Sequence, residues 1–191
     1  MTLKDISPII KKSGNLMIVD RDDCQWIGDG AALYPLYNFP KMSDEALLKV
    51  LSLENEDITV THSDAAVIDF DYEQRGLTDP DGKVLKELGP VLIIDGVTYI
   101  SHYTIYGAIV TAKHYYKPIE RDKSYPEDPI FYFRTRGKRK APYIVAKKGL
   151  IVLGYIMPLQ TTHVAEQYAR LSDQLRLAGI QFWGDSENEE D

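Results

Sequence analysis

The spacing of apolar residues in the first 37 positions predicts a short helix followed by three strands. Ile6, Ile9 and Ile10 would form one apolar face of a helix that Asp5 caps, with Pro8 in its first turn and Gly14 at its end. Residues 15–37 then alternate as short strands do, with turns at 21–23 and 29–30. Pro35 predicts that the third strand lies at a sheet edge or a bulge.

A second helix is predicted over residues 44–51. Ser43 would cap it, and acidic residues in its first turn would complement the helix dipole. Its buried face would consist of Ala46, Leu47, Val50 and Leu51. Residues 54–89 are acidic and weakly patterned, with a turn at 80–82, which predicts either a strand pair or a long surface excursion.

The second half repeats this order of elements. Two short strands are predicted around Asp95-Gly96, followed by a helix that Ser101 caps and that runs to about Tyr115. Its apolar face would comprise Ile105, Ile109, Ala112 and Tyr116. Three strands are predicted over 129–136, 141–147 and 150–159, with turns at 137–140 and 147–149.

The last predicted element is an amphipathic helix over residues 162–178, capped by Thr162 and ended by Gly179. Its apolar positions, spaced four and three apart, are Val164, Tyr168, Leu171, Leu175 and Ala178. Two heptads are too short for an independent coiled coil, so the stripe must pack on something larger. Either it docks on its own sheet in a monomer, or it forms a homodimer.

The fold class that these elements predict is α+β. Helix-plus-antiparallel-meander units would occupy residues 1–53 and 90–160, separated by the acidic excursion 54–89. The C-terminal helix (161–180) and an acidic tail (181–191) would follow, all within one compact domain.

Composition narrows the class of protein further. The chain has 191 residues, a formal net charge of -7 and one cysteine, Cys24. A single cysteine excludes an internal disulfide framework and fits a reducing cytoplasm. The longest apolar stretch, residues 150–158, is far shorter than the roughly 20 residues that span a bilayer. We therefore expect a cytoplasmic protein that has no contact with a membrane.

Positive charge is concentrated in one place. Residues 134–148 hold seven basic residues and no acidic one, which leaves 15 basic and 29 acidic residues, a charge of -14, on the rest of the chain. Any contact with a phosphate backbone would have to use this predicted hairpin. The alternative is that the charges keep a hairpin tip soluble.

The sequence offers no constellation that argues for catalysis, a cofactor or a bound metal. Gly28 and Gly30 lack the third glycine of a dinucleotide fingerprint, and a hairpin turn explains them better. Cys24, close to Trp26, is expected to be a small buried apolar residue. Alternation of Asp69, Asp71 and Glu73 would place three carboxylates on one face of a strand, where they could bind a divalent cation, but a solvated acidic strand or loop explains them better.

One family resemblance gives a more specific hypothesis. The segments "VTYISHYTIYGAIVTAK" and "APYIVAKKGLIVLGYIMPLQ" resemble the last domain of bacterial DNA sliding clamps, over about residues 97–160. That family ends on an apolar-Met-Pro-apolar sequence, matched here by residues 156–159. By resemblance, Met157, Pro158 and Leu159 would line a pocket for short peptide motifs of partner proteins. The departure is that clamp chains end near this motif, whereas this chain continues for 31 residues after Gln160.

The resemblance also implies a role for the basic hairpin, because clamps place basic residues on the surface that faces DNA. The residues in question are Arg134, Arg136, Lys138, Arg139 and Lys140. The chain is also similar to uncharacterised proteins of phages and prophages of Firmicutes.

Three hypotheses follow from the sequence. The first is a non-catalytic, clamp-like binding protein of phage or prophage origin, acting in DNA replication or in takeover of host machinery. The second is an interaction or inhibitor protein, unrelated to clamps, that masks a host protein through its acidic surface. The third is a metal-dependent enzyme that uses Asp69, Asp71 and Glu73.

Overall fold

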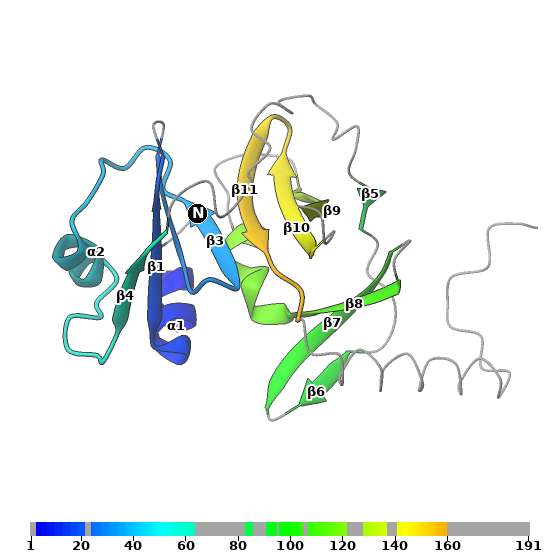
Figure 1. Ribbon diagram of the computed structural model, residues 1–191, viewed down its shortest axis with the longest axis horizontal. Coiled ribbons are helices and arrows are strands. Elements are labelled where there is room, and N and C mark those ends of the chain that lie inside the picture. Colours follow the sequence, from blue (N-terminus) through cyan, green and yellow to red (C-terminus); the bar gives the residue numbers. More distant parts are fainter. Residues whose placement is uncertain are drawn as a thin grey trace, which may run out of the picture. The chain divides into compact units, whose positions relative to one another are not determined.

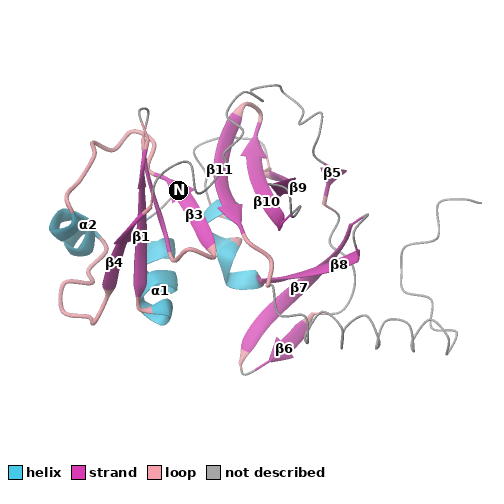
Figure 2. Cartoon of the chain, in the orientation of Figure 1, coloured by secondary structure: helices cyan, strands magenta, loops and turns pink. Residues whose placement is uncertain are grey.

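The chain forms two compact units in the computed structural model, which describes residues 3–21, 24–63, 83–85, 91–94, 96–104, 107–121, 128–136 and 141–159. Unit 1 comprises Met1–Val84 and His114–Met157, and unit 2 comprises Leu85–Lys113 and Pro158–Asp191. Helices and strands are both abundant (Figures 1 and 2), so the predicted α+β class is confirmed. No helix in the described ranges is long and apolar enough to cross a membrane.

Unit 1 contains an eight-stranded sheet in the order β4-β1-β2-β3-β11-β10-β9-β5. Its strands are β1 (Asn15–Asp20), β2 (Gln25–Gly28), β3 (Ala32–Pro35), β4 (Thr59–His62), β5 (Lys83–Val84), β9 (Ile130–Arg136), β10 (Ala141–Lys148) and β11 (Ile151–Ile156). Its helices are α1 (Leu3–Ser13), α2 (Asp44–Val50) and α3 (Lys117–Glu120), and the short 3-10 helix η2 (Lys113–Tyr115) precedes α3. Neighbouring strands are antiparallel except for the parallel pair β1–β4.

Two three-stranded meanders meet in this sheet at the central pair β3–β11. One side is the meander β1–β2–β3, preceded in the chain by α1, and the other is β9–β10–β11, preceded by α3. Leu33 lies opposite Tyr155 and Ala32 opposite Ile156 where the two meanders join. A helix followed by three strands therefore occurs twice within unit 1. The second repeat begins with α3 and not with the helix that the sequence predicts from Ser101 to about Tyr115.

Helices α1 and α3 pack on one face of this sheet, which we call the helical face. Ile6, Ile9 and Ile10 of α1 are at most 4% exposed, as predicted. Helix α1 begins at Leu3, however, so Asp5 lies in its first turn instead of capping it, and Pro8 lies inside the helix. The Asp5 carboxylate accepts a hydrogen bond of 2.8 Å from Arg121, the residue that ends α3, and this ion pair links the two helices.

Helix α2 begins where the sequence predicts. The Ser43 hydroxyl accepts a hydrogen bond from the Ala46 N–H, and Leu47 and Leu51 are buried. The prediction that Val50 belongs to the buried face is wrong, because this side chain is 48% exposed.

Proline 35 also differs from its prediction. It is the last residue of β3 and pairs with Trp26 of β2. Strand β3 lies inside the sheet, between β2 and β11, so it is neither an edge strand nor bulged at this position. The pairing of β3 with β11 involves Ala32 and Leu33, so the missing N–H of Pro35 lies beyond that ladder. Pairing with β2 continues past the proline, because the Leu36 N–H donates to the Gln25 carbonyl at 2.8 Å.

Unit 2 contains a three-stranded antiparallel sheet of β6 (Leu92–Ile94), β7 (Val97–Thr104) and β8 (Gly107–Ala112). The predicted turn at Asp95-Gly96 joins β6 to β7, and Gly96 has the positive φ of 75° that such a turn requires. The predicted helix from Ser101 to Tyr115 is wrong: residues 97–112 form the hairpin β7–β8, in which Thr104 pairs with Gly107.

The remaining sequence predictions lie outside the described residues. These are residues 64–82 and 86–89 of the excursion predicted over 54–89, with its three carboxylates, the helix 162–178 and the acidic tail. The described parts of the predicted excursion contain β4, which pairs with β1, and β5, which pairs with β9.

Candidate functional site

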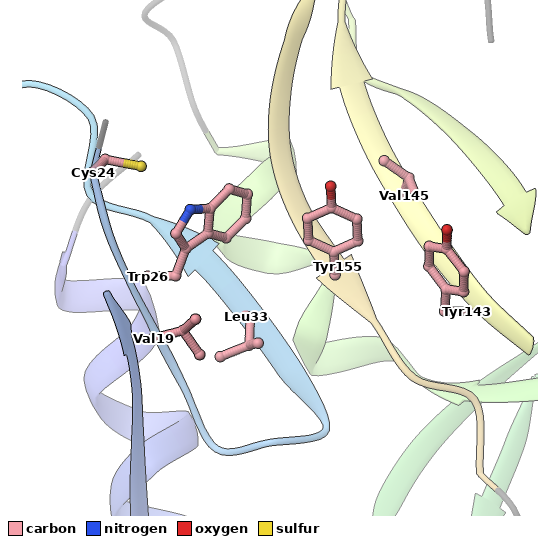
Figure 3. Packing of buried hydrophobic residues seen from close by; sticks show 7 residues of the cluster. All are labelled: Val19, Cys24, Trp26, Leu33, Tyr143, Val145 and Tyr155. Atoms are coloured by element: carbon pink, nitrogen blue, oxygen red, sulfur yellow. The ribbon is translucent and has the colours of Figure 1, made fainter. Parts of the chain in front are cut away.

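The second face of the unit 1 sheet carries a row of aromatic side chains, and we call it the aromatic face. Its buried cluster consists of Val19, Cys24, Trp26, Leu33, Tyr143, Val145 and Tyr155 (Figure 3). Strand pairing explains this, because Val19 lies opposite Trp26, Leu33 opposite Tyr155, and Tyr155 opposite Val145. Residues that are opposite one another in a sheet share a face, so five strands contribute to one cluster.

The aromatic rings of this face form a row in which each ring lies close to the next. The Trp26 and Tyr155 ring centroids are 5.3 Å apart, and those of Tyr155 and Tyr143 are 6.1 Å apart. Tyr37 meets Trp26 edge-on at 6.4 Å. Figure 3 shows the Tyr143 and Tyr155 hydroxyls directed to the same side. Trp26 is 1% exposed, so its ring belongs to the core and is not an open stacking platform.

Basic side chains border this aromatic face. Arg134 of β9 lies directly opposite Tyr143 of β10 and is half-buried. Arg21, two residues beyond Val19, is also half-buried. Its backbone N–H donates to the Cys24 carbonyl across the turn between β1 and β2. Lys147 is buried, with its Nζ 5.9 Å from the centroid of the Tyr132 ring. Cations over aromatic rings are favourable in such partly desolvated places.

Burial raises the pKa of the Tyr155 hydroxyl well above its usual value, and Tyr143 and Tyr37 act in the same direction. Arg21 and Arg134 act in the opposite direction, since a guanidinium favours a nearby phenolate. Tyr155 is therefore protonated at neutral pH and can donate a hydrogen bond. Within the described part of the chain, the charged groups that act on this hydroxyl are both guanidiniums.

Two of the five predicted DNA-binding residues, Arg134 and Arg136, lie in β9. Strand pairing extends from Ile130–Lys147 to Arg136–Ala141, so Arg134 and Arg136 lie in the strand that leads to the hairpin tip. Lys138, Arg139 and Lys140 lie outside the described residues. The other two cations of the basic segment, Lys147 and Lys148, are only 4% and 6% exposed, so they lie in the interior and add nothing to an outer charged surface.

The predicted partner-binding residues follow β11. Met157 is half-buried, packs against the aromatic cluster and donates its N–H to the Ala31 carbonyl at 2.7 Å. Pro158 is buried, and Leu159 is 37% exposed with its N–H donating to the Val110 carbonyl at 2.9 Å. Met157 is the last residue of unit 1, whereas Pro158 and Leu159 belong to unit 2.

A second polar cluster, which the sequence did not predict, surrounds Asp29. One of its carboxylate oxygens accepts hydrogen bonds from the backbone N–H groups of Ala31 and Ala32, and the other accepts one from the Tyr115 hydroxyl at 2.9 Å. The Tyr115 carbonyl in turn accepts a hydrogen bond from Tyr34, which is fully buried. Both oxygens of Asp29 thus accept hydrogen bonds, so the cluster secures the turn between β2 and β3.

His114 lies beside this cluster, with its ring centroid 4.2 Å from that of Tyr115. Burial lowers the pKa of His114 below its usual value, Lys12 lowers it further, and Asp29 opposes them. The imidazole is therefore neutral at pH 7. The described residues contain no group of three or more histidine, cysteine or acidic side chains that could hold a metal ion.

Comparison of the chain with protein-family models, curated proteins and solved structures finds no significant match. The clamp and phage resemblances of the sequence receive no support from these comparisons.

Proposed function

We propose that this protein is a non-catalytic, clamp-like binding protein of phage or prophage origin that holds nucleic acid through the β9–β10 hairpin, in DNA replication or in takeover of host machinery. The observation that carries the proposal is the position of the basic segment. Arg134 and Arg136 lie on a regular strand, and the sequence that follows it, residues 137–140, is basic, while the rest of the chain is strongly acidic.

The distribution of charge determines how such a contact would work. A net charge of -7 repels a phosphate backbone over most of the surface, so attraction is confined to the hairpin. Lysine and arginine contacts to phosphates hold the backbone without reading sequence. The proposed contact is therefore non-specific and sensitive to salt.

Two further observations support the clamp-like part of the proposal. A clamp-like architecture requires a repeated unit of helix and sheet, and unit 1 contains helix plus meander twice. The Met157-Pro158-Leu159 segment directly follows β11, where the proposal places a pocket for a peptide motif of a host or phage partner.

The test is nucleic-acid binding at low salt, measured by fluorescence anisotropy with a labelled oligonucleotide. Replacing Arg136, Lys138 and Arg139 by glutamate should abolish binding. For the unmodified protein, the logarithm of the association constant should fall linearly with the logarithm of the salt concentration. The matched control reverses Lys4, Lys41 and Lys49, which are exposed and outside the hairpin. Both variants change the net charge equally, so equal losses would refute a local contact.

The acidic surface favours a second function, in which the protein masks a basic region of a host protein. A charge of -14 outside the basic segment is the observation behind it. If the unmodified protein binds no oligonucleotide at low salt, and the hairpin variant retains its protein partner, this second function replaces the first.

A further inference from the structure

We propose that strand β6 of unit 2 pairs with the β6 strand of a second copy of this chain, so that two three-stranded sheets join into one continuous sheet. The strand order β6-β7-β8 places β6 at an edge, and no described strand lies on its other side (Figure 1). This contact goes beyond the proposed function and does not depend on nucleic-acid binding.

The backbone of β6 directs hydrogen-bonding groups to its open edge at alternate residues. A two-residue turn joins β6 to β7, so the pair Ile94–Val97 that closes this turn exchanges backbone hydrogen bonds. Leu92, two residues earlier, directs its N–H and C=O groups to β7 as well. Ile93 and Val91 occupy the alternate positions, so their N–H and C=O groups point away from β7.

The same two residues have exposed apolar side chains. Ile93 is 73% exposed and Val91 is 48% exposed. Ile93 shares a face of the sheet with Ile100 and Thr111, which are 6% and 0% exposed. Burial on this face therefore decreases from β8 through β7 to β6, and an additional strand beside β6 would cover the part that is left exposed.

Strand β6 lacks the features that usually prevent an edge strand from pairing. Residues 88–94 contain no charged residue, and the register of β6 with β7 is continuous, without a bulge. Other described edges differ, because β5 carries Lys83 and β4 is polar, with the His62 ring hydrogen-bonded to α2. The outer edge of β8 is already met at Val110, whose carbonyl accepts a hydrogen bond from the Leu159 N–H.

A second copy of β6 fits this edge, because the edge is complementary to itself. If two copies run antiparallel with a two-fold axis at Leu92, Val91 of each copy lies opposite Ile93 of the other. Each of these pairs exchanges both of its backbone hydrogen bonds, and the exposed side chains of both copies meet on one face. Because residues 88–94 are uncharged, two acidic chains bring no like charges together along the strand.

Sedimentation equilibrium over a range of protein concentrations tests this contact. The mass of the unmodified protein should rise from 21.7 kDa to twice that value as concentration increases. The transition should depend on concentration, because a small interface dissociates readily. A monomer mass at every concentration would overturn the proposal and leave this edge to a strand of another protein.

Ile93→Lys should abolish the dimer, because it places a charge on the pairing edge. The fold should survive, since the side chain of Ile93 is 73% exposed. The matched control is Val50→Lys, which changes the net charge equally at an exposed aliphatic residue of α2 and should leave the dimer intact. A dimer that survives Ile93→Lys would form elsewhere on the chain, and equal loss in both variants would reflect net charge alone; either result would overturn the proposal.

Proline substitutions test whether backbone pairing is responsible. Ile93→Pro removes an N–H that points away from β7, so the circular dichroism spectrum should be retained while the dimer is lost. Leu92→Pro removes an N–H that is directed to β7 and should instead destabilise unit 2. A folded Ile93→Pro variant that still dimerises would contradict pairing through β6.

Disulfide cross-linking tests the register. With the two-fold axis at Leu92, residue 92 of each copy forms a non-hydrogen-bonded pair, with Cα atoms about 4.5 Å apart, within the range for a disulfide. Leu92→Cys should therefore give a covalent dimer on oxidation, whereas Ile93→Cys, a diagonal neighbour of its copy at about 7–8 Å, should cross-link more slowly. The unmodified protein is the control, because its one cysteine, Cys24, is buried. Faster cross-linking through Ile93→Cys would overturn the proposed pairing.

Discussion

At Gly28, the last residue of β2, the backbone of the following strand comes too close for any side chain. A Cβ at this position would lie 1.8 Å from the Ala32 carbonyl oxygen and 2.8 Å from its carbon. Because both atoms are backbone, no rotamer change can relieve the clash. Gly28→Ala should therefore lower the free energy of unfolding by about 3 kcal/mol or more, measured by chemical denaturation.

Gly149→Ala is the matched control for this prediction. A Cβ at Gly149 would meet nothing within 4 Å, and the cost there comes from the positive φ of 55° alone. That cost is about 1 kcal/mol. If the two alanine variants were equally stable, close backbone approach at Gly28 would not be the cause.

Two buried tyrosines should make the protein sensitive to alkali. Burial raises the pKa of Tyr34 well above 10, Asp29 and neighbouring tyrosines add to this, and burial likewise raises that of Tyr155. Unfolded tyrosines ionise near pH ~10. Above that pH the native state binds more protons than the unfolded state, so the contribution is complete below pH ~10 and is lost as pH rises further.

The measurement is the denaturation midpoint between about pH 9 and pH 11, with tyrosinate absorbance followed in parallel. Tyr155→Phe should reduce the loss of stability over this range, and Tyr34→Phe should do so while costing about 1 kcal/mol at neutral pH, since its bond to the Tyr115 carbonyl disappears. An alkaline loss identical in all three proteins would contradict the assignment.

His114 should titrate below the usual histidine range. Its pKa is lowered by burial first and by Lys12 second. Below pH ~6.5 the unfolded chain therefore protonates this histidine more readily than the native protein does. Neutral His114 thus contributes stability that is complete above pH ~6.5 and is lost as pH falls through the native pKa. Lys12→Gln should move the His114 midpoint upward in an NMR titration, and Lys49→Gln, on α2, should not move it.

At the scale of elements, local sequence signals were sufficient to predict a helix or strand wherever its apolar residues are regularly spaced and the turns beside it are short. The isoleucines of α1, the cap at Ser43 and the turns between β1, β2 and β3 each specify their element within a few residues. Strands β9, β10 and β11 were predicted for the same reason, because glycine and charged residues separate their apolar runs.

The hairpin β7–β8 shows where local signals fail. Ile105, Ile109 and Ala112 have helical spacing, but the segment 97–112 is rich in β-branched and aromatic residues, which favour strands. The backbone hydrogen-bonding groups of this segment pair with β6 and across the hairpin, which the spacing of apolar residues alone does not indicate. Strand propensity and tertiary pairing therefore outweighed the periodicity.

The candidate sites also differ in how far the sequence alone could predict them. Arg134 and Arg136 were identified from the sequence, because the run of basic residues is local. The contact between Trp26 and Tyr155 was not, since it depends on the register of β3 with β11, which joins residues more than 100 positions apart in the chain. Likewise, nothing near Asp29 in the sequence indicates that Tyr115 binds it.

At the scale of the whole molecule, the central pair β3–β11 is the seam that makes unit 1 one sheet. Gly154 lies at this seam, where a Cβ would be 3.1 Å from the Leu33 carbonyl oxygen, 3.1 Å from the Tyr34 ring and 3.2 Å from Ile119 of α3. Gly154→Val would therefore press on both meanders and on the helical face at once. We expect a loss of about 1–3 kcal/mol, the range for overpacking a core.

Because the seam is shared, this loss should appear in both meanders together. Hydrogen exchange of the amides in β1–β3 and in β9–β11 should accelerate by the same factor in Gly154→Val, as expected for one cooperative unit. Leu150→Ala, in the exposed turn before β11, is the control and should change exchange little, since Leu150 is 53% exposed. Faster exchange confined to β9–β11 would mean that the two meanders unfold separately. Concerted loss would instead show that the pairing of β3 with β11 couples the two meanders into one unfolding unit.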